Sequence, residues 1–215
     1  MSILVTGGTG YIGSHTVVEL LHEGYEVVIV DNLSNSSIDM VERIKKITKK
    51  ALTFYNIDLL DKESLVQVFE KHEIEAVIHF AGLKAVGESV DYPLKYYRNN
   101  IISTINLCEV MEKFKVYQLI FSSSATVYGN PEKLPITEDA PTKAINPYGR
   151  TKLMCEEFLR DISKTNSSWR IALLRYFNPV GAHPSGLIGE KPDGIPNNLM
   201  PYISKVATGE LKYLN

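Results

Sequence analysis

The feature that most constrains this chain is a glycine-rich segment that joins a short apolar run to an amphipathic helix. Residues 6–13 read Thr-Gly-Gly-Thr-Gly-Tyr-Ile-Gly, with regularly spaced glycines at Gly7, Gly10 and Gly13. Glycines in this pattern permit a tight turn, let backbone N–H groups approach a ligand, and let the helix pack closely on the strand. The helix N-terminus adds partial positive charge at the same place. The segment therefore predicts a dinucleotide site with the pyrophosphate at the turn.

Apolar runs and amphipathic helical segments alternate along the chain, an order typical of a doubly wound parallel α/β sheet of the Rossmann type. We expect strands at residues 3–5, 26–30, 53–55, 76–80, 118–122 and 170–175. We expect helices at residues 11–23, 38–50, 62–73, 93–113, 148–163 and 198–208. The periodicity is lost after residue 175, where a loop rich in glycine and proline begins. The sequence therefore predicts a nucleotide-binding domain over residues 1–175 and the beginning of a smaller, incomplete domain over residues 176–215.

Composition and charge exclude several classes of function. The 215 residues carry a formal net charge of -2 and no block of five like charges, which argues against nucleic acid or an acidic membrane surface as a partner. No apolar run reaches the ~18–20 residues of a membrane helix, and the N-terminus does not resemble a signal peptide. The two cysteines, Cys108 and Cys155, are expected to be reduced. We therefore expect a cytoplasmic protein, and the five histidines show no spacing that predicts a metal site.

An acidic residue ends the second expected strand. Asp31 follows Gly13 by 18 residues, which is the place where a carboxylate accepts hydrogen bonds from the adenosine ribose of a dinucleotide. A carboxylate there would repel a 2′-phosphate, so the sequence favours NAD over NADP. The alternative interpretation is that Asp31 only caps a turn with Asn32.

Two further segments follow strands of the predicted sheet. Asp58 follows the third strand, and Phe80, Ala81 and Gly82 follow the fourth. The carboxyl ends of parallel strands are where open sheets bind their ligands. We therefore expect Asp58 to hydrogen-bond the adenine amino group, and Gly82 to let the cofactor lie against the backbone.

The candidate catalytic group is a tyrosine–lysine pair. Tyr148 and Lys152 are four residues apart and share one face of the helix that follows the fifth strand, and that strand ends in three serines at residues 122–124. A phenol has an ordinary pKa of about 10 and is a poor base at neutral pH. We expect the Lys152 ammonium and a cationic nicotinamide to lower the pKa of Tyr148. Ser124 would then bridge the phenol and a substrate hydroxyl, unless the serines only cap a turn.

These residues together resemble the extended short-chain dehydrogenase/reductase family and, within it, the UDP-glucose 4-epimerase family. The closer resemblance covers the whole length and is carried by residues 4–8, 79–89, 121–129, 175–186 and 194–201. The segment 121–129 reads Phe-Ser-Ser-Ser-Ala-Thr-Val-Tyr-Gly, and the segment 79–89 reads His-Phe-Ala-Gly-Leu-Lys-Ala-Val-Gly-Glu-Ser. Only the glycine spacing and the Tyr148-x-x-x-Lys152 spacing are shared with the wider family.

The resemblance implies an NAD-dependent isomerase that inverts carbon 4 of a UDP-hexose through a transient 4-keto sugar. Tyr148 would be the base, Lys152 would tune it and hold the nicotinamide ribose, and Ser124 would contact the hexose. The NAD site would also be lined by Tyr11, Ile12, Asp31, Asn32, Asn35, Asp58, Leu59, Phe80, Lys84, Asn99 and Phe177. The UDP-sugar would contact Asn178, Asn198 and Leu199. The resemblance further implies a homodimer.

Two other functions compete with this interpretation. Nucleotide-sugar dehydratases and decarboxylases resemble these epimerases but usually carry an Asp-Glu pair just after the fifth strand, where this chain has Ser124, Ala125 and Thr126. A module that binds NAD without chemistry is the second alternative. The presence of Tyr148, Lys152 and Ser124 argues against it, because such a module has no need of a tuned phenol.

Overall fold

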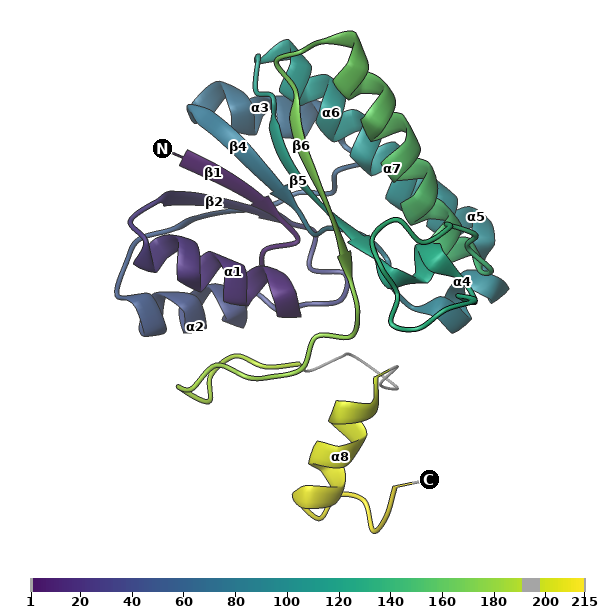
Figure 1. Ribbon diagram of the computed structural model, residues 1–215. Helices are drawn as coiled ribbons and strands as arrows, with labels where there is room; N and C mark the ends of the chain where they lie inside the picture. The colour runs from purple at the N-terminus through teal and green to yellow at the C-terminus, as the bar shows by residue number, and fades with distance from the viewer. Residues whose placement is uncertain (1, 191–197, 215) are drawn as a thin grey trace.

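The computed structural model describes residues 2–190 and 198–214, and its centre is a parallel sheet. The strands are β1 (Ser2–Thr6), β2 (Glu26–Asp31), β3 (Thr53–Asn56), β4 (Ile74–His79), β5 (Gln118–Ser124) and β6 (Arg170–Tyr176). Their order in the sheet is β3-β2-β1-β4-β5-β6 (Figure 1). The chain order reverses between β1 and β4, which is the position where doubly wound sheets open a crevice for a ligand. The doubly wound fold expected from the sequence is confirmed.

Helices cover both faces of this sheet. Helices α1 (Tyr11–His22) and α2 (Asp39–Thr48) lie on one face, and α3 (Lys62–Lys71), α6 (Ser103–Lys113) and α7 (Pro147–Thr165) lie on the other (Figure 1). Successive residues of β1 supply two separate cores, because side chains alternate across a strand. Ile3 and Val5 pack in the core under α1 and α2, whereas Leu4 packs in the core under α3, α6 and α7.

The helix expected over residues 93–113 is present with those bounds, but it contains a π-helical turn that the sequence did not predict. The structure has α4 (Val86–Asp91), α5 (Pro93–Tyr97), a π-helical turn η1 (Arg98–Ile102) and then α6. The π-turn holds the buried side chain of Asn100, which donates to the carbonyl of Leu83 at 3.0 Å and to Oγ1 of Thr151 at 3.1 Å. π-turns are often found at functional sites, where an inserted residue redirects a side chain.

The chain after β6 turns back toward α1 and α2. Ile188 is buried in the core beneath these helices, and Arg43 of α2 donates a hydrogen bond to the carbonyl of Leu187 at 3.1 Å. Helix α8 (Leu199–Ala207) lies within the helix expected at residues 198–208. The part of the expected loop and of the epimerase-like segment that falls on residues 191–197 lies outside the described residues. None of the helices in residues 2–190 and 198–214 has the length and apolar character needed to cross a membrane.

Candidate active site

The glycine turn between β1 and α1 has no room for a side chain at Gly7 or Gly13. Gly7 has a φ of +69°, and a Cβ atom there would lie 2.6 Å from the backbone nitrogen of Ala81. A Cβ atom at Gly13 would lie 2.2 Å from the carbonyl oxygen of Gly7. Gly10 caps α1 without any side-chain hydrogen bond. The glycines therefore let α1 pack closely on the turn, and the first turn of α1 carries backbone N–H groups and partial positive charge.

Asp31, at the end of β2, lies beside this turn. Its carboxylate accepts a hydrogen bond from the backbone N–H of Thr9 at 3.1 Å, from that of Leu33 at 3.0 Å, and from the hydroxyl of Ser36 at 3.3 Å. The carboxylate therefore does organise the turn after β2, as the alternative interpretation supposed. It also joins that turn to the glycine segment, where a ribose acid would be placed.

The other residues proposed for the adenosine end of the cofactor differ in whether their side chains are free to bind a ligand. The Asn32 amide donates to the carboxylate of Asp58 at 3.0 Å, and Asp58 also accepts from the backbone N–H of Leu60 at 2.9 Å. Asn35 is exposed. Leu59 is buried in the core under α3, so only its backbone is suited to contact a ligand.

The segment after β4 connects the glycine turn to α7. The backbone N–H groups of Phe80 and Ala81 donate to the carbonyl of Thr6 at 2.9 Å and 3.2 Å. A Cβ atom at Gly82 would lie 3.7 Å from Nζ of Lys152. Residues 80–82 therefore lie between the glycine turn after β1 and Lys152 of α7, as expected from the position of β4 between β1 and β5.

Ser124, Tyr148 and Lys152 come together at the carboxyl end of β5. The Asn146 side chain caps α7 by accepting from the N–H of Gly149 at 2.8 Å, so the helix begins just before Tyr148. The Ser124 hydroxyl interacts with the Tyr148 phenol and acts to lower its pKa. The buried Lys152 ammonium donates to the carbonyl of Ser122 at 2.7 Å and lies 4.8 Å from the centre of the Phe121 ring.

The expected low pKa of Tyr148 is not found in this structure. Burial raises the pKa of the Tyr148 phenol, and only the interaction with Ser124 opposes that rise. The Lys152 ammonium is directed at the Ser122 carbonyl, which is a physical reason for its lack of effect. Burial also lowers the pKa of Lys152 from 10.5 to about 8. The phenol is therefore the protonated form at neutral pH unless another positive charge is placed beside it.

His79 is a buried neutral neighbour of this group. Burial and the Lys152 charge lower its pKa to about 3. Its ring nitrogens bond the hydroxyls of Thr6 at 2.6 Å and Thr104 at 3.0 Å. A histidine held between two hydroxyls in this way is structural. Within the described ranges, no group of three or more His, Cys, Asp or Glu residues is arranged to hold a metal ion.

Glu190 joins several candidates that the sequence placed in different sites. It accepts a hydrogen bond from the Asn198 amide at 2.6 Å and lies 3.8 Å from Nζ of Lys84. Burial raises the pKa of Tyr11, and the Glu190 charge adds to that rise. Tyr11 donates to the carbonyl of Gly181 at 2.7 Å. Sequence reasoning missed Glu190, because a single acid in an aperiodic loop gives no signal.

The other candidates lie at the periphery of this arrangement. Phe177, Asn178 and Leu199 are exposed. The Asn99 amide donates to Oδ1 of the buried Asn100 at 3.0 Å, so Asn99 belongs to the π-turn. Asn100 was also missed, although the doubled asparagine at residues 99–100 was a possible signal.

These features define a dinucleotide-binding protein of the Rossmann class: a doubly wound sheet, a glycine turn, an acid at the end of β2, and a Ser–Tyr–Lys group at the end of β5. More particularly, the chain belongs to the NAD dependent epimerase/dehydratase family, which it matches over residues 3–215.

Several curated relatives are similar over the whole chain. The chain is 66% identical to the UDP-glucose 4-epimerase of Bacillus subtilis (strain 168), covering 100% of this chain and 63% of that protein. It is 57% identical to the UDP-glucose 4-epimerase of Dictyostelium discoideum, with 99% of this chain and 62% of that protein covered. The chain thus spans less than two thirds of the length of these relatives.

Solved structures of UDP-glucose 4-epimerases have the same fold as this chain. The UDP-glucose 4-epimerase from Bifidobacterium longum in complex with NAD+ and UDP superposes with a TM-score of 0.95 at 56% identity, over 99% of this chain and 64% of that one. The UDP-glucose 4-epimerase from Stenotrophomonas maltophila with bound NAD and formylated UDP-arabinopyranose has a TM-score of 0.96 at 53% identity, over 99% of this chain and 63% of that one.

Proposed function

We propose that the protein containing this chain binds NAD and a UDP-hexose and inverts carbon 4 of the sugar. The observation that carries the proposal is the grouping of Ser124, Tyr148 and Lys152 at the carboxyl end of β5, beside Gly82 and across the crevice from the glycine turn. The names of the curated relatives support the same activity.

The residues present fit a dinucleotide. Gly7 and Gly13 let the N-terminus of α1 pack against the end of β1, and its partial positive charge suits a pyrophosphate. The Asp31 carboxylate suits an unphosphorylated ribose. When bound, NAD would accept hydride from the sugar carbon and return it. The proposed NAD contacts are Gly7, Gly10, Tyr11, Ile12, Gly13, Asp31, Asn32, Asn35, Asp58, Leu59, Phe80, Ala81, Gly82, Lys84, Asn99, Tyr148, Lys152 and Phe177.

The side chains of this chain would handle the proton. The Tyr148 phenolate would accept the proton of the 4-hydroxyl while the Ser124 hydroxyl holds that group in place. Because burial raises the pKa of Tyr148, the phenolate form needs positive charge beside it. Lys152 would supply part of that charge once a ligand ribose draws its ammonium toward the crevice.

The segment after β6 would bind the UDP-sugar. Asn178, Asn198 and Leu199 would contact the UDP-sugar, and residues 176–215 would begin the domain that binds it.

A homodimer is supported by exposed apolar side chains on α5 and α6, among them Leu94, which is 81% exposed, and Ile105. A cytoplasmic location is supported by the two free cysteines, both buried.

The dehydratase alternative is less well supported. The residues that follow Ser124 form a short helix, η2 (Ala125–Tyr128), in which the hydroxyl of Thr126 donates to Ser124 at 2.9 Å. That helix carries no acid to expel water from a sugar.

The test is conversion of UDP-galactose to UDP-glucose by the protein with NAD, followed by separation of the two sugars. We expect conversion by the unaltered protein and loss of at least about a thousandfold in Tyr148→Phe, the order of effect for removing a catalytic acid–base. The matched control is Tyr213→Phe, which removes an exposed phenol and should have no effect. Elimination of water from the sugar would overturn the proposal in favour of a dehydratase. NAD binding without any sugar chemistry would favour a non-catalytic module.

A further inference from the structure

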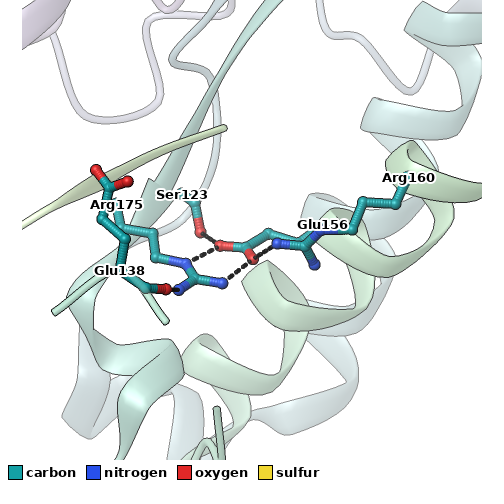
Figure 2. A network of polar contacts seen from close by, with 5 residues as sticks. All are labelled: Ser123, Glu138, Glu156, Arg160 and Arg175. Atoms are coloured by element: carbon teal, nitrogen blue, oxygen red, sulfur yellow. Dashed lines mark hydrogen bonds and ion pairs between the residues drawn. The ribbon is translucent and has the colours of Figure 1, made fainter. Parts of the chain in front are cut away.

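A carboxylate without solvent contact lies behind the candidate active site. The side chain of Glu156, on α7, is 0% exposed. Its Oε1 accepts from the hydroxyl of Ser123 at 2.5 Å and from Nε of Arg175 at 2.9 Å. Its Oε2 accepts from Nη2 of Arg175 at 2.7 Å and from Nη2 of Arg160 at 2.9 Å (Figure 2). Burial of a carboxylate is unfavourable unless charge and hydrogen bonds compensate, and the two parallel bonds from one guanidinium do so here.

The network stays ionised. Burial would raise the pKa of Glu156, but the hydrogen bonds from Arg175 and Ser123 outweigh that effect and leave the pKa below its ordinary value. The hydrogen bond to Glu156 in turn raises the pKa of Arg175, against the effect of burial. The pair is therefore charged at any pH at which the protein would be assayed.

Arg175 ties this carboxylate to three other parts of the fold. It lies near the end of β6, and its Nη1 donates to the backbone carbonyl of Glu138 at 3.2 Å, in the loop between η2 and α7 (Figure 2). Its guanidinium lies 4.7 Å from the centre of the Tyr128 ring in η2. One ion pair therefore fixes α7 against β6, η2 and the loop that leads into α7.

Residues 122–124 of β5 each interact with a different turn on one face of α7. The carbonyl of the first accepts from Lys152 at 2.7 Å, the hydroxyl of the second donates to Glu156 at 2.5 Å, and the third interacts with the Tyr148 phenol. Tyr148, Lys152 and Glu156 are four residues apart, which places them in a row along the helix. A slip of α7 along β5 would therefore break all three contacts together.

We propose that Glu156 is a positioning residue, which sets α7 along β5 so that the Tyr148 phenol meets Ser124, and that Arg175 holds Glu156 in this role. Glu156 is enclosed by Ser123 and two arginines, so it acts through the helix and not on the reacting atoms. The effect on turnover rests on the proposed function, whereas the effect on the Tyr148–Ser124 contact does not.

The sharpest probe is Ser123→Ala, because it removes the bond between β5 and Glu156 while the ion pair with Arg175 stays in place. The second probe is Glu156→Gln, which keeps the shape and removes the charge. The matched control is Glu157→Gln, the next residue of α7, which is exposed. Glu156→Asp keeps the charge and should retain more activity than Glu156→Gln.

The first measurement is the steady-state conversion of UDP-galactose. We expect Ser123→Ala and Glu156→Gln to lower kcat about 10- to 100-fold, the effect of a small misplacement of a reacting group. KM and the dissociation constant of NAD should change less than about threefold. A purely structural role would lower the melting temperature and the amount of folded protein, but leave kcat per folded molecule unchanged.

The second measurement needs no turnover. The Tyr148 phenol is titrated by NMR of protein labelled with [13C]tyrosine, with Tyr148→Phe to assign the resonance. The titratable group that interacts with Tyr148 is Tyr96, whose hydroxyl donates to Glu88 at 2.7 Å, and Lys152 on the same helix is directed at the Ser122 carbonyl. The variants leave all three of these groups intact. We expect Ser123→Ala and Glu156→Gln to raise the pKa of Tyr148, because the Ser124 interaction that lowers it is weakened. An unchanged pKa together with unchanged kcat in folded Ser123→Ala would overturn the proposal. If the unaltered protein converts no sugar, the proposed function fails, and the NMR titration still decides the positioning role.

Discussion

The Nζ atom of Lys152 lies 3.7 Å from the point that a Cβ atom would occupy at Gly82. This contact joins the end of β4 to the middle of α7, and Gly82 has a φ of +157°. The lysine that the sequence assigns to the nicotinamide ribose therefore stands directly over the glycine that the sequence assigns to the cofactor backbone.

Gly82→Ala should consequently weaken NAD binding. The new methyl group would meet the Lys152 ammonium and, at 3.3 Å, the Asn100 amide oxygen, and the backbone would be strained at this φ. We expect the dissociation constant of NAD, measured by titration calorimetry, to rise about tenfold, the equivalent of ~1.4 kcal/mol. The matched control is Gly87→Ala in α4, where a Cβ atom would meet nothing within 4 Å. Equal affinities in the two variants would contradict the prediction.

Lys152→Met should stabilise the protein at neutral pH and abolish its activity. Burial lowers the pKa of Lys152 from 10.5 to about 8. The charged lysine is thus disfavoured in the folded state, and its folded pKa lies below its unfolded pKa. Below about pH 8 this penalty is fully present, and it disappears as the pH rises to about 10.5.

Chemical denaturation at several pH values checks this prediction. We expect Lys152→Met to exceed the unaltered protein in free energy of unfolding by on the order of 2–3 kcal/mol at neutral pH. The gap should close between about pH 8 and about pH 10.5. A gap that is constant across this range would show that the methionine acts through packing and not through charge.

Asp31→Ala should change the choice between NAD and NADP. The substitution removes a ribose acceptor and a negative charge that repels a 2′-phosphate. It also removes the acceptor of the Thr9, Leu33 and Ser36 hydrogen bonds, so a fall in stability of about 1–3 kcal/mol is expected. The measurement is the ratio of the NAD and NADP dissociation constants, which is insensitive to the stability loss. An unchanged ratio would mean that Asp31 serves the turn alone.

Tyr11→Phe should loosen the segment that follows β6. The phenol of Tyr11 donates to the carbonyl of Gly181, and this bond ties α1 to residues 177–190. Its loss is expected to cost about 1 kcal/mol locally. Hydrogen exchange followed by mass spectrometry should show faster exchange in residues 181–189, while β1 and β4 keep their protection. Equal acceleration in the central strands would indicate general destabilisation instead.

Much of the fold could be predicted from the local sequence pattern. The features that could not be predicted depend on contacts between distant parts of the chain. The strands and the glycine turn could be predicted because burial on both faces makes parallel strands continuously apolar. The π-turn at residues 98–102 could not be predicted, because the buried Asn100 bonds Leu83 and Thr151 from distant parts of the chain.

The candidate site shows the same division. Tyr148, Lys152 and Ser124 were found from spacing and from their place after one strand, and the structure brings them together. Burial, a property of the folded environment, raises the pKa of Tyr148, so the lowering expected from Lys152 together with a cationic nicotinamide stays a prediction. Glu190 became visible only through its contact with Asn198.

The strand order also dictates when each half of the site can form as the chain is made. β1 lies between β2 and β4, and β2 lies between β1 and β3, so the glycine turn and Asp31 have all their sheet partners once residue 79 has emerged from the ribosome. Tyr148 and Lys152 come later, and the ion pair that sets their helix waits for Arg175. Domains generally fold as units during synthesis. All the strands that the nucleotide half needs are therefore already present in the emerging chain when Tyr148 is translated, whereas the six-stranded sheet is complete only when β6 follows.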